Sequence, residues 1–248
     1  MILDTLVADP GAALLVLLVA GHCIADFGPR VRSTAGGVPS AGVLLVHVGL
    51  VVAVHMIVVL PFLGFELIVA ILGIGLLHAL IDGLKTRVPR LDRESATVLI
   101  LDQAAHLVVL VVAWVLLIES TGVPVPVVPP SWLRPWVTAS VVVAAFAANA
   151  TGGSVLVRIV LGPLDRSGDS GHAGAGRLIG ILERTLTLIL ILAGEWAAMA
   201  LLATAKSVAR FDELKDREFA EYYLVGTLTS LLVAILIGLA LRVLGLGV

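Results

Sequence analysis

Histidine and aspartate occur four residues apart in three separate apolar stretches of the sequence. The three pairs are His22/Asp26, His78/Asp82 and, in reversed order, Asp102/His106. Side chains four residues apart lie on one face of an α-helix, about 6 Å apart along its axis. Ionisable groups within a membrane span are costly and usually face the interior of a bundle. The spacing therefore predicts that the three pairs converge on one polar pocket.

Three imidazoles beside three carboxylates form a set of donor atoms that suits a divalent transition metal. We expect zinc, with manganese and magnesium as alternatives, and we take all six side chains of the three pairs as metal ligands. A bound metal with an open position and a nearby carboxylate can activate water for hydrolysis. Two other interpretations remain open. The groups could form a proton or cation pathway, or each aspartate could simply accept a hydrogen bond from a histidine and fix helix packing.

Lys85 extends the second pair, because it follows Asp82 by three residues and shares its helix face. It could hold a phosphate group, pair with Asp82 or extend to the membrane interface. We assign the catalytic roles to Asp82, Asp102 and Lys85. Further polar residues in apolar stretches are secondary candidates, with burial or mutual pairing as the simpler interpretation. They are His47, Glu183 and Lys206.

The composition indicates what positions these residues. Hydrophobic residues make up 59% of the 248 residues and charged residues 14%, and the mean hydropathy is +1.11. Apolar runs reach the roughly 20 residues that span a bilayer as a helix. The sequence thus predicts an all-α, polytopic transmembrane helix bundle of about eight spans, with the seventh either crossing or re-entering. The expected spans are 11–28, 41–62, 64–86, 95–120, 135–161, 177–193, 195–209 and 222–242.

The distribution of basic residues predicts the orientation of the bundle. If the N-terminus lies outside, all of the 16 Lys and Arg residues except Arg134 and Arg242 fall on the cytoplasmic side. The Pro-rich segment 122–135 is then an external linker between two four-span halves, 1–121 and 136–248. This pattern favours a multi-pass protein of a bacterial cytoplasmic membrane. The reversed third pair crosses in the opposite direction, so all three aspartates face the cytoplasmic leaflet.

The motifs resemble those of a bacterial polytopic membrane family, the domain-of-unknown-function family 3307. The resemblance rests on His-x3-Asp from His22, His-x3-Asp-x2-Lys from His78, and Asp-Gln-x2-His from Asp102, and it covers roughly residues 10–120. It implies a membrane-embedded His/Asp site and supplies no established activity. A weaker similarity, through His-x3-Asp in a multi-span helical frame, is to bacterial membrane-bound metal-dependent hydrolases. By analogy it implies hydrolytic chemistry.

These observations favour a metal-dependent hydrolase that acts on a lipid-linked or phosphate-bearing substrate at the cytoplasmic leaflet. An ion- or proton-coupled transporter that uses the His/Asp groups is the first alternative, and a noncatalytic membrane scaffold is the second. The expected partners are membrane lipids and an anionic or lipid-linked substrate, without nucleic acid. An oligomer is compatible with the sequence.

Overall fold

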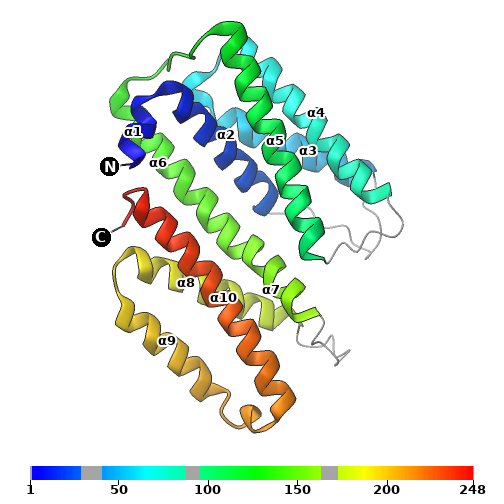
Figure 1. Ribbon diagram of the computed structural model, residues 1–248, viewed down its shortest axis with the longest axis vertical. Helices are drawn as coiled ribbons and strands as arrows, with labels where there is room; N and C mark the ends of the chain where they lie inside the picture. Colours follow the sequence, from blue (N-terminus) through cyan, green and yellow to red (C-terminus); the bar gives the residue numbers. More distant parts are fainter. Residues whose placement is uncertain (1, 29–40, 88–94, 163–172, 248) are drawn as a thin grey trace. The chain divides into compact units, whose positions relative to one another are not determined.

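The computed structural model describes residues 2–28, 41–87, 95–162 and 173–247, and these are helical without a strand among them (Figure 1). The chain divides into two compact units, Met1–Ala144 and Ala145–Val248. The all-α fold class is therefore confirmed. Some of the basic residues used to predict orientation lie outside the described residues: Arg30, Arg32, Arg90, Arg93 and Arg166.

Unit 1 contains the helices of the predicted N-terminal half, 1–121, together with most of the first helix of the predicted C-terminal half, 136–248. They are α1 (Ile2–Ala8), α2 (Pro10–Phe27), α3 (Ala41–Val58), the 3₁₀ turn η1 (Leu60–Phe62), α4 (Phe65–Arg87), α5 (Ala96–Thr121) and most of α6 (Pro130–Ala147). Local chemistry explains where α2 begins, because the Asp9 carboxylate accepts from the backbone N–H of Gly11 at 2.9 Å and Pro10 occupies the first turn. Ser95 caps α5 in the same way, accepting from Thr97 N–H at 3.3 Å.

Four of these helices form a closed bundle in which α3 contacts α2 and α4, and α5 contacts α4 and α2 (Figure 1). Leu14, Leu17, Val51, Ile71 and Leu110 are almost completely buried between them. Burial of such side chains and van der Waals packing hold the bundle together. A bundle of this kind gathers side chains from four helices around one axis, which is how a polar site can form within apolar elements.

Two glycines allow α3 to approach both of its neighbours closely. A Cβ atom at Gly21 of α2 would lie 3.1 Å from His55 of α3, and one at Gly75 of α4 would lie 2.5 Å from Val52 of α3. Small residues at helix interfaces let backbones approach one another in membrane bundles. This close packing brings the residues of α3 that lie further toward its N-terminus, including His47, within reach of α2 and α4.

Tryptophan hydrogen bonds join further helices of unit 1. Trp114 of α5 donates to the backbone oxygen of Gly11 at 2.8 Å, and Trp136 of α6 donates to that of Val58 at 2.8 Å. The residues between α5 and α6 belong to the Pro-rich segment 122–135 and lie within unit 1. The division into units falls later along the chain than the predicted linker.

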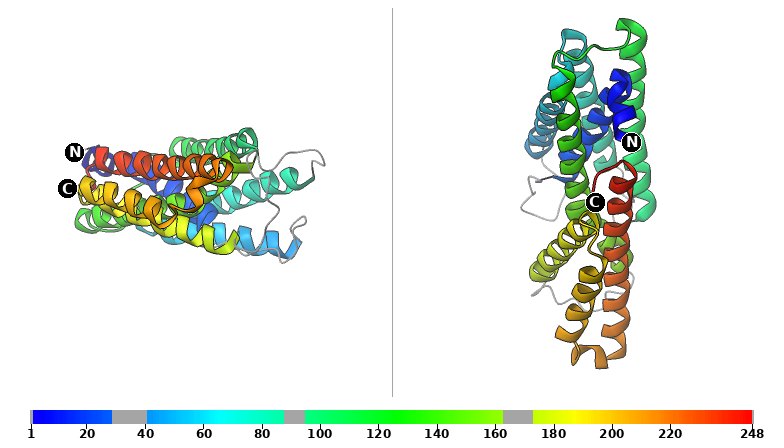
Figure 2. Two further views of the ribbon diagram at one scale, coloured as in Figure 1. Left: turned by 90° about the horizontal axis from the view of Figure 1, so that it is seen from below. Right: turned by 90° about the vertical axis from the view of Figure 1, so that its left-hand side faces the viewer.

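Unit 2 contains the helices of the C-terminal half, in which α8 packs against both α9 and α10 (Figure 2). The elements are the π-helical turn η2 (Ala148–Gly152), α7 (Gly153–Leu161), α8 (Ala173–Leu192), α9 (Trp196–Ala209), the 3₁₀ turn η4 (Glu213–Lys215) and α10 (Arg217–Val243). Gly194 adopts φ +76° between α8 and α9, a conformation that favours glycine. The expected break between the sixth and seventh helices is confirmed.

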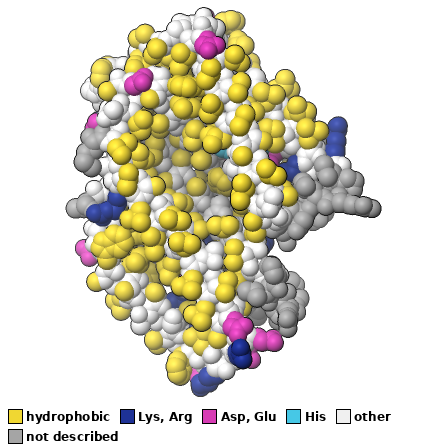
Figure 3. All heavy atoms as spheres, viewed as in Figure 1, with side chains coloured by type: hydrophobic (Ala, Val, Ile, Leu, Met, Phe, Trp, Pro, Cys, Tyr) yellow, Lys and Arg dark blue, Asp and Glu magenta, His cyan; other side chains and the backbone are white. Residues whose placement is uncertain are grey.

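The surface of the helices is apolar, as expected for contact with lipid. Large side chains such as Leu45, Leu76, Ile100 and Leu228 are between 63% and 71% exposed. Hydrophobic side chains cover much of the face seen in Figure 3. By length and composition, five helical stretches of the described chain could cross a membrane: Pro10–Phe27, Phe65–Lys85, Ala96–Thr121, Pro130–Leu161 and Arg217–Val243. Eight crossings and an external N-terminus remain predictions.

Candidate metal centre

The helices α2, α3, α4 and α5 each contribute polar side chains to one cluster. Three of the contributing histidines are buried, namely His22, His78 and His106. Their rings lie together, with centroids 5.9 Å apart for His22 and His78, 5.1 Å for His22 and His106, and 4.2 Å for His78 and His106. The structure therefore brings the three predicted motifs into one place.

At the centre of the cluster, His47, His78 and Asp82 present three donor atoms to one another. The Nε2 atoms of His47 and His78 are 3.2 Å apart, and Oδ2 of Asp82 lies 3.6 Å from the first and 3.3 Å from the second. Tetrahedral zinc with bonds of about 2.0–2.1 Å separates its ligand atoms by about 3.3–3.4 Å. The triangle thus has the spacing of three ligands around one such ion.

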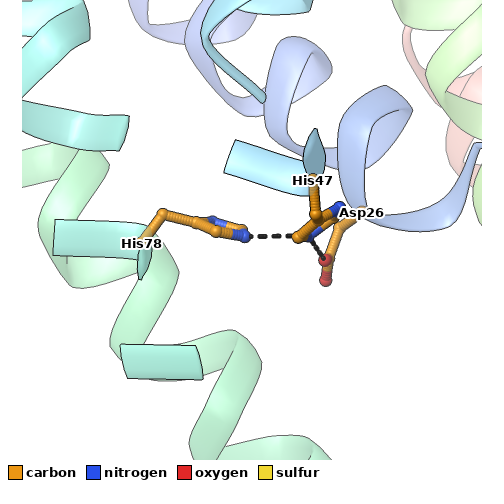
Figure 4. Close-up of side chains that lie close together, drawn as sticks. All are labelled: Asp26, His47 and His78. Carbon is orange, nitrogen blue, oxygen red and sulfur yellow. Dashed lines mark hydrogen bonds and ion pairs between the residues drawn. The ribbon is translucent and has the colours of Figure 1, made fainter. Parts of the chain in front are cut away.

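Asp26 lies beside this triangle, and its Oδ1 atom is 3.7 Å from Nε2 of His47 (Figure 4). Donor atoms of Asp26, His47 and His78 all lie within 4.8 Å of one another, and so do those of His78, Asp82 and His106. These are buried His/Asp groups that could hold a metal ion. Because both groups use His78, whose Nε2 carries one lone pair, they describe one site rather than two.

His106 has a fixed tautomer and an unpaired ring nitrogen, a pattern that His55 shares, but only His106 belongs to a group of potential ligands. Its Nδ1 lies 2.8 Å from the backbone oxygen of Asp102, so Nδ1 carries the proton and donates. Its Nε2 is buried and has no hydrogen-bond partner among the described residues. Metal-ligating histidines commonly donate their other ring N–H to a carbonyl or carboxylate, which fixes the tautomer. An unpaired buried nitrogen would otherwise be unfavourable.

His22 lies outside both groups, although the sequence predicted it as a ligand. Its Nε2 is 3.2 Å from Oε1 of Gln103, and the amide of Gln103 donates to Oδ2 of Asp26 at 2.8 Å. Gln103 therefore links the two residues of the first motif and leaves Oδ1 of Asp26 directed at His47. No role was predicted for Gln103 from the sequence. Its spacing of three from His106, on one helix face, was the available signal.

Lys85 pairs with Asp102 of α5 rather than with Asp82 of its own helix, at 2.7 Å between Nζ and Oδ2. The Asp102 side chain is 8% exposed, and its Oδ1 is buried without a hydrogen-bond partner in the described part of the chain. Asp102 belongs to neither of the two groups. In this arrangement it positions Lys85 beside the candidate metal centre.

The exposed edge of the cluster lies at α3 and α4. His78 is 2% exposed, whereas the side chains of His47, Asp82 and Lys85 are 19%, 22% and 32% exposed. The lysine and two members of the triangle therefore lie at this exposed edge. The other two secondary candidates, Glu183 and Lys206, lie in unit 2 and pair with each other at 2.5 Å.

Comparison with known proteins places this site in a family. Residues 14–125 match the family described as "Protein of unknown function (DUF3307)", and this part of the chain belongs to it. The matched segment contains α3, α4 and α5 and nearly all of α2, and hence every residue of the cluster. No curated protein and no solved structure matches the chain.

Proposed function

We propose that unit 1 binds one divalent transition-metal ion and uses it to hydrolyse a lipid-linked or phosphate-bearing substrate. The observation that carries the proposal is the triangle of His47, His78 and Asp82, whose edges of 3.2, 3.6 and 3.3 Å match ligand spacing around zinc. The unpaired Nε2 of His106 supports it, because this atom is available as a further ligand.

The donor set favours zinc. Imidazole nitrogen suits zinc and other transition metals, whereas magnesium prefers an octahedron of oxygen ligands and keeps several waters. Manganese is the next candidate because carboxylates are part of the set. Catalytic zinc sites have three protein ligands and one open position. Three of the four donors His47, His78, Asp82 and His106 would then bind the metal at one time, which would leave the fourth position to water at the exposed edge.

The residues around the triangle have the chemistry that hydrolysis requires. Bound zinc lowers the pKa of water and polarises a phosphoryl or carbonyl oxygen. Asp26, with Oδ2 held by Gln103 and Oδ1 directed into the site, is placed to accept a proton. Lys85, held by Asp102 at the exposed edge, is placed to attract an anionic substrate. We therefore assign Asp82 to the metal and the role of base to Asp26.

The apolar helices suggest how a lipid substrate would arrive. A substrate in the bilayer could reach the exposed edge at α3 and α4 while its head group contacts Lys85. With the orientation predicted from the basic residues, this edge belongs to the cytoplasmic leaflet of a bacterial inner membrane.

The test is turnover by the purified full chain in lipid nanodiscs, with p-nitrophenyl phosphate, bis(p-nitrophenyl) phosphate and phosphatidic acid as probes. Chelation should abolish hydrolysis, and added zinc should restore it. In Asp26→Asn the turnover should fall by about 10²–10⁴-fold, the usual contribution of a general base. Metal content should be largely retained, because four other donors remain.

His55→Ala is the matched control, because His55 is a fully buried histidine of the same bundle that bonds to the backbone oxygen of Val51 at 2.8 Å. It should leave turnover unchanged at matched thermal stability. Hydrolysis that is insensitive to chelation would contradict the proposal. Metal- or proton-dependent flux in proteoliposomes without cleavage would replace it with a carrier.

A further inference from the structure

A small pocket lies in unit 2 between α8, α9 and α10. Its volume is about 20 Å³, enough for one water-sized particle. Its polar lining consists of Glu183, Arg184, Thr187, Lys206, Thr227 and Ser230. These helices are among those expected to cross the membrane, where polar groups are costly unless they serve a purpose.

Arg184 is the most buried charge at this cavity, with 3% of the residue exposed. Its Nε donates to the backbone oxygen of Asn149 at 3.0 Å, and Nη2 donates to the backbone oxygen of Ala150 at 2.9 Å and to Oγ of Ser154 at 2.5 Å. Its Nη1 donates to Oγ of Ser230 at 3.3 Å. All four acceptors are neutral. The carboxylate that interacts with the guanidinium charge is that of Glu183, the preceding residue.

The π-helical turn η2 explains how the guanidinium fits against the helix. A π turn interrupts the usual hydrogen-bond ladder and releases carbonyl groups. Asn149 and Ala150 lie in this turn and supply the two carbonyl acceptors of Arg184. A Cβ atom at Gly153 would lie 2.8 Å from Nε of Arg184, so glycine is needed there. The local structure is thus built around Arg184.

Hydroxyl groups complete the donor side of the cavity. Thr187 is fully buried, and its Oγ1 has no hydrogen-bond partner within the described residues. Ser230 accepts from Arg184, so its own hydroxyl proton is available for donation. A guanidinium has five N–H groups. Arg184 donates four of them in the bonds described above, so one N–H group on Nη1 remains available.

The charges of the cavity favour an anion. The Glu183 carboxylate is paired with Lys206 at 2.5 Å, and these two charges cancel, which leaves the positive charge of Arg184. We propose that the cavity binds one small monovalent anion the size of chloride, held by Arg184, Thr187 and Ser230. The small volume of about 20 Å³ favours a single-atom anion over phosphate or sulfate. Such an anion neutralises Arg184 and stabilises unit 2.

The test is equilibrium binding of radioactive chloride to the full chain, purified in detergent and exchanged into gluconate at constant ionic strength. Wild-type protein should bind one chloride per chain saturably, and chloride should raise the melting temperature. Thr187→Val keeps the side-chain volume and removes an unpaired buried hydroxyl, so folding should be preserved or improved. Its chloride affinity should fall about tenfold or more, as expected for one hydrogen bond to a charged group.

Two further variants separate anion binding from general structural effects. Glu183→Gln removes the negative charge that opposes an anion and should tighten chloride binding. Thr204→Val removes a hydroxyl of α9 that bonds to the backbone oxygen of Ala200 at 2.9 Å outside the cavity, and it should leave chloride binding unchanged.

Three results would overturn the proposal. The first is the absence of saturable chloride binding, which would mean that the cavity holds water only. The second is wild-type chloride affinity in Thr187→Val, and the third is displacement of chloride by inorganic phosphate. The last result would assign the cavity to a phosphate group, and lipid analysis of the purified protein would then show whether that group belongs to a bound lipid.

Discussion

Replacing His78 by alanine is expected to lower the affinity of the protein for zinc by more than about 100-fold. Loss of a residue that only supports the ligands typically costs about 10–100-fold, and a direct ligand costs more. His78 is the one residue common to both groups of potential ligands, and at 2% exposure its place cannot be taken readily by solvent. Competition with a zinc-binding dye, together with metal analysis, measures the effect.

Two other histidines of the same bundle serve as comparisons. His55→Ala removes an equally buried ring that bonds to the backbone oxygen of Val51 and belongs to neither group of potential ligands, so it should leave zinc affinity unchanged. His22→Ala removes the partner of Gln103 rather than a ligand. Its loss of zinc affinity should therefore lie between those of His55→Ala and His78→Ala, within about 10–100-fold. Equal losses in all three variants at matched stability would mean that the histidines only maintain packing.

The second large effect is expected on stability, in Lys85→Met. The variant leaves the carboxylate of Asp102 buried and without its ion-pair partner, which should lower the free energy of unfolding by about 3 kcal/mol. This value is the lower end of the range for breaking a buried ion pair, because Lys85 is partly exposed. Replacing both partners, in Lys85→Met/Asp102→Leu, should recover most of the loss, since the buried charge is then gone. Unfolding in mixed micelles of increasing SDS content measures the difference.

Lys215→Met is the matched control for this cycle. Lys215 pairs with Asp212 at the same distance, 2.7 Å, but the two side chains are 67% and 90% exposed. An exposed pair of this kind should contribute less than about 1 kcal/mol. If Lys85→Met lowers the free energy of unfolding no more than Lys215→Met does, the pair of Lys85 and Asp102 has no structural role. The inference that Asp102 positions Lys85 would then be wrong.

The sequence predicted the helices and the convergence of the His/Asp motifs well, because both depend on local rules. Apolar runs of span length define the helices, and a spacing of four places His78 with Asp82 and Asp102 with His106 on single faces. The turn at Gly194 also followed from a local signal, since glycine readily adopts positive φ.

The choice of partners within the cluster could not be predicted, because it depends on how each helix is rotated about its axis. The helix α3 is apolar on all sides, so the sequence identified His47 only as a secondary candidate and not as a ligand at the centre of the site. The pairing of Lys85 with Asp102 across α4 and α5 competes with a pairing to Asp82 along α4, and sequence spacing favours only the second. The π turn beside Arg184 has no comparable sequence signature.

The most direct test of the candidate metal centre is X-ray absorption spectroscopy of purified wild-type protein reconstituted with zinc. We predict one zinc ion per chain in a four-coordinate shell of nitrogen and oxygen, with bonds of about 2.0–2.1 Å and the outer scattering pattern of at least two imidazoles. A protein that retains no stoichiometric zinc, or zinc with a shell of oxygen alone, would contradict the assignment of His47, His78 and Asp82 as ligands.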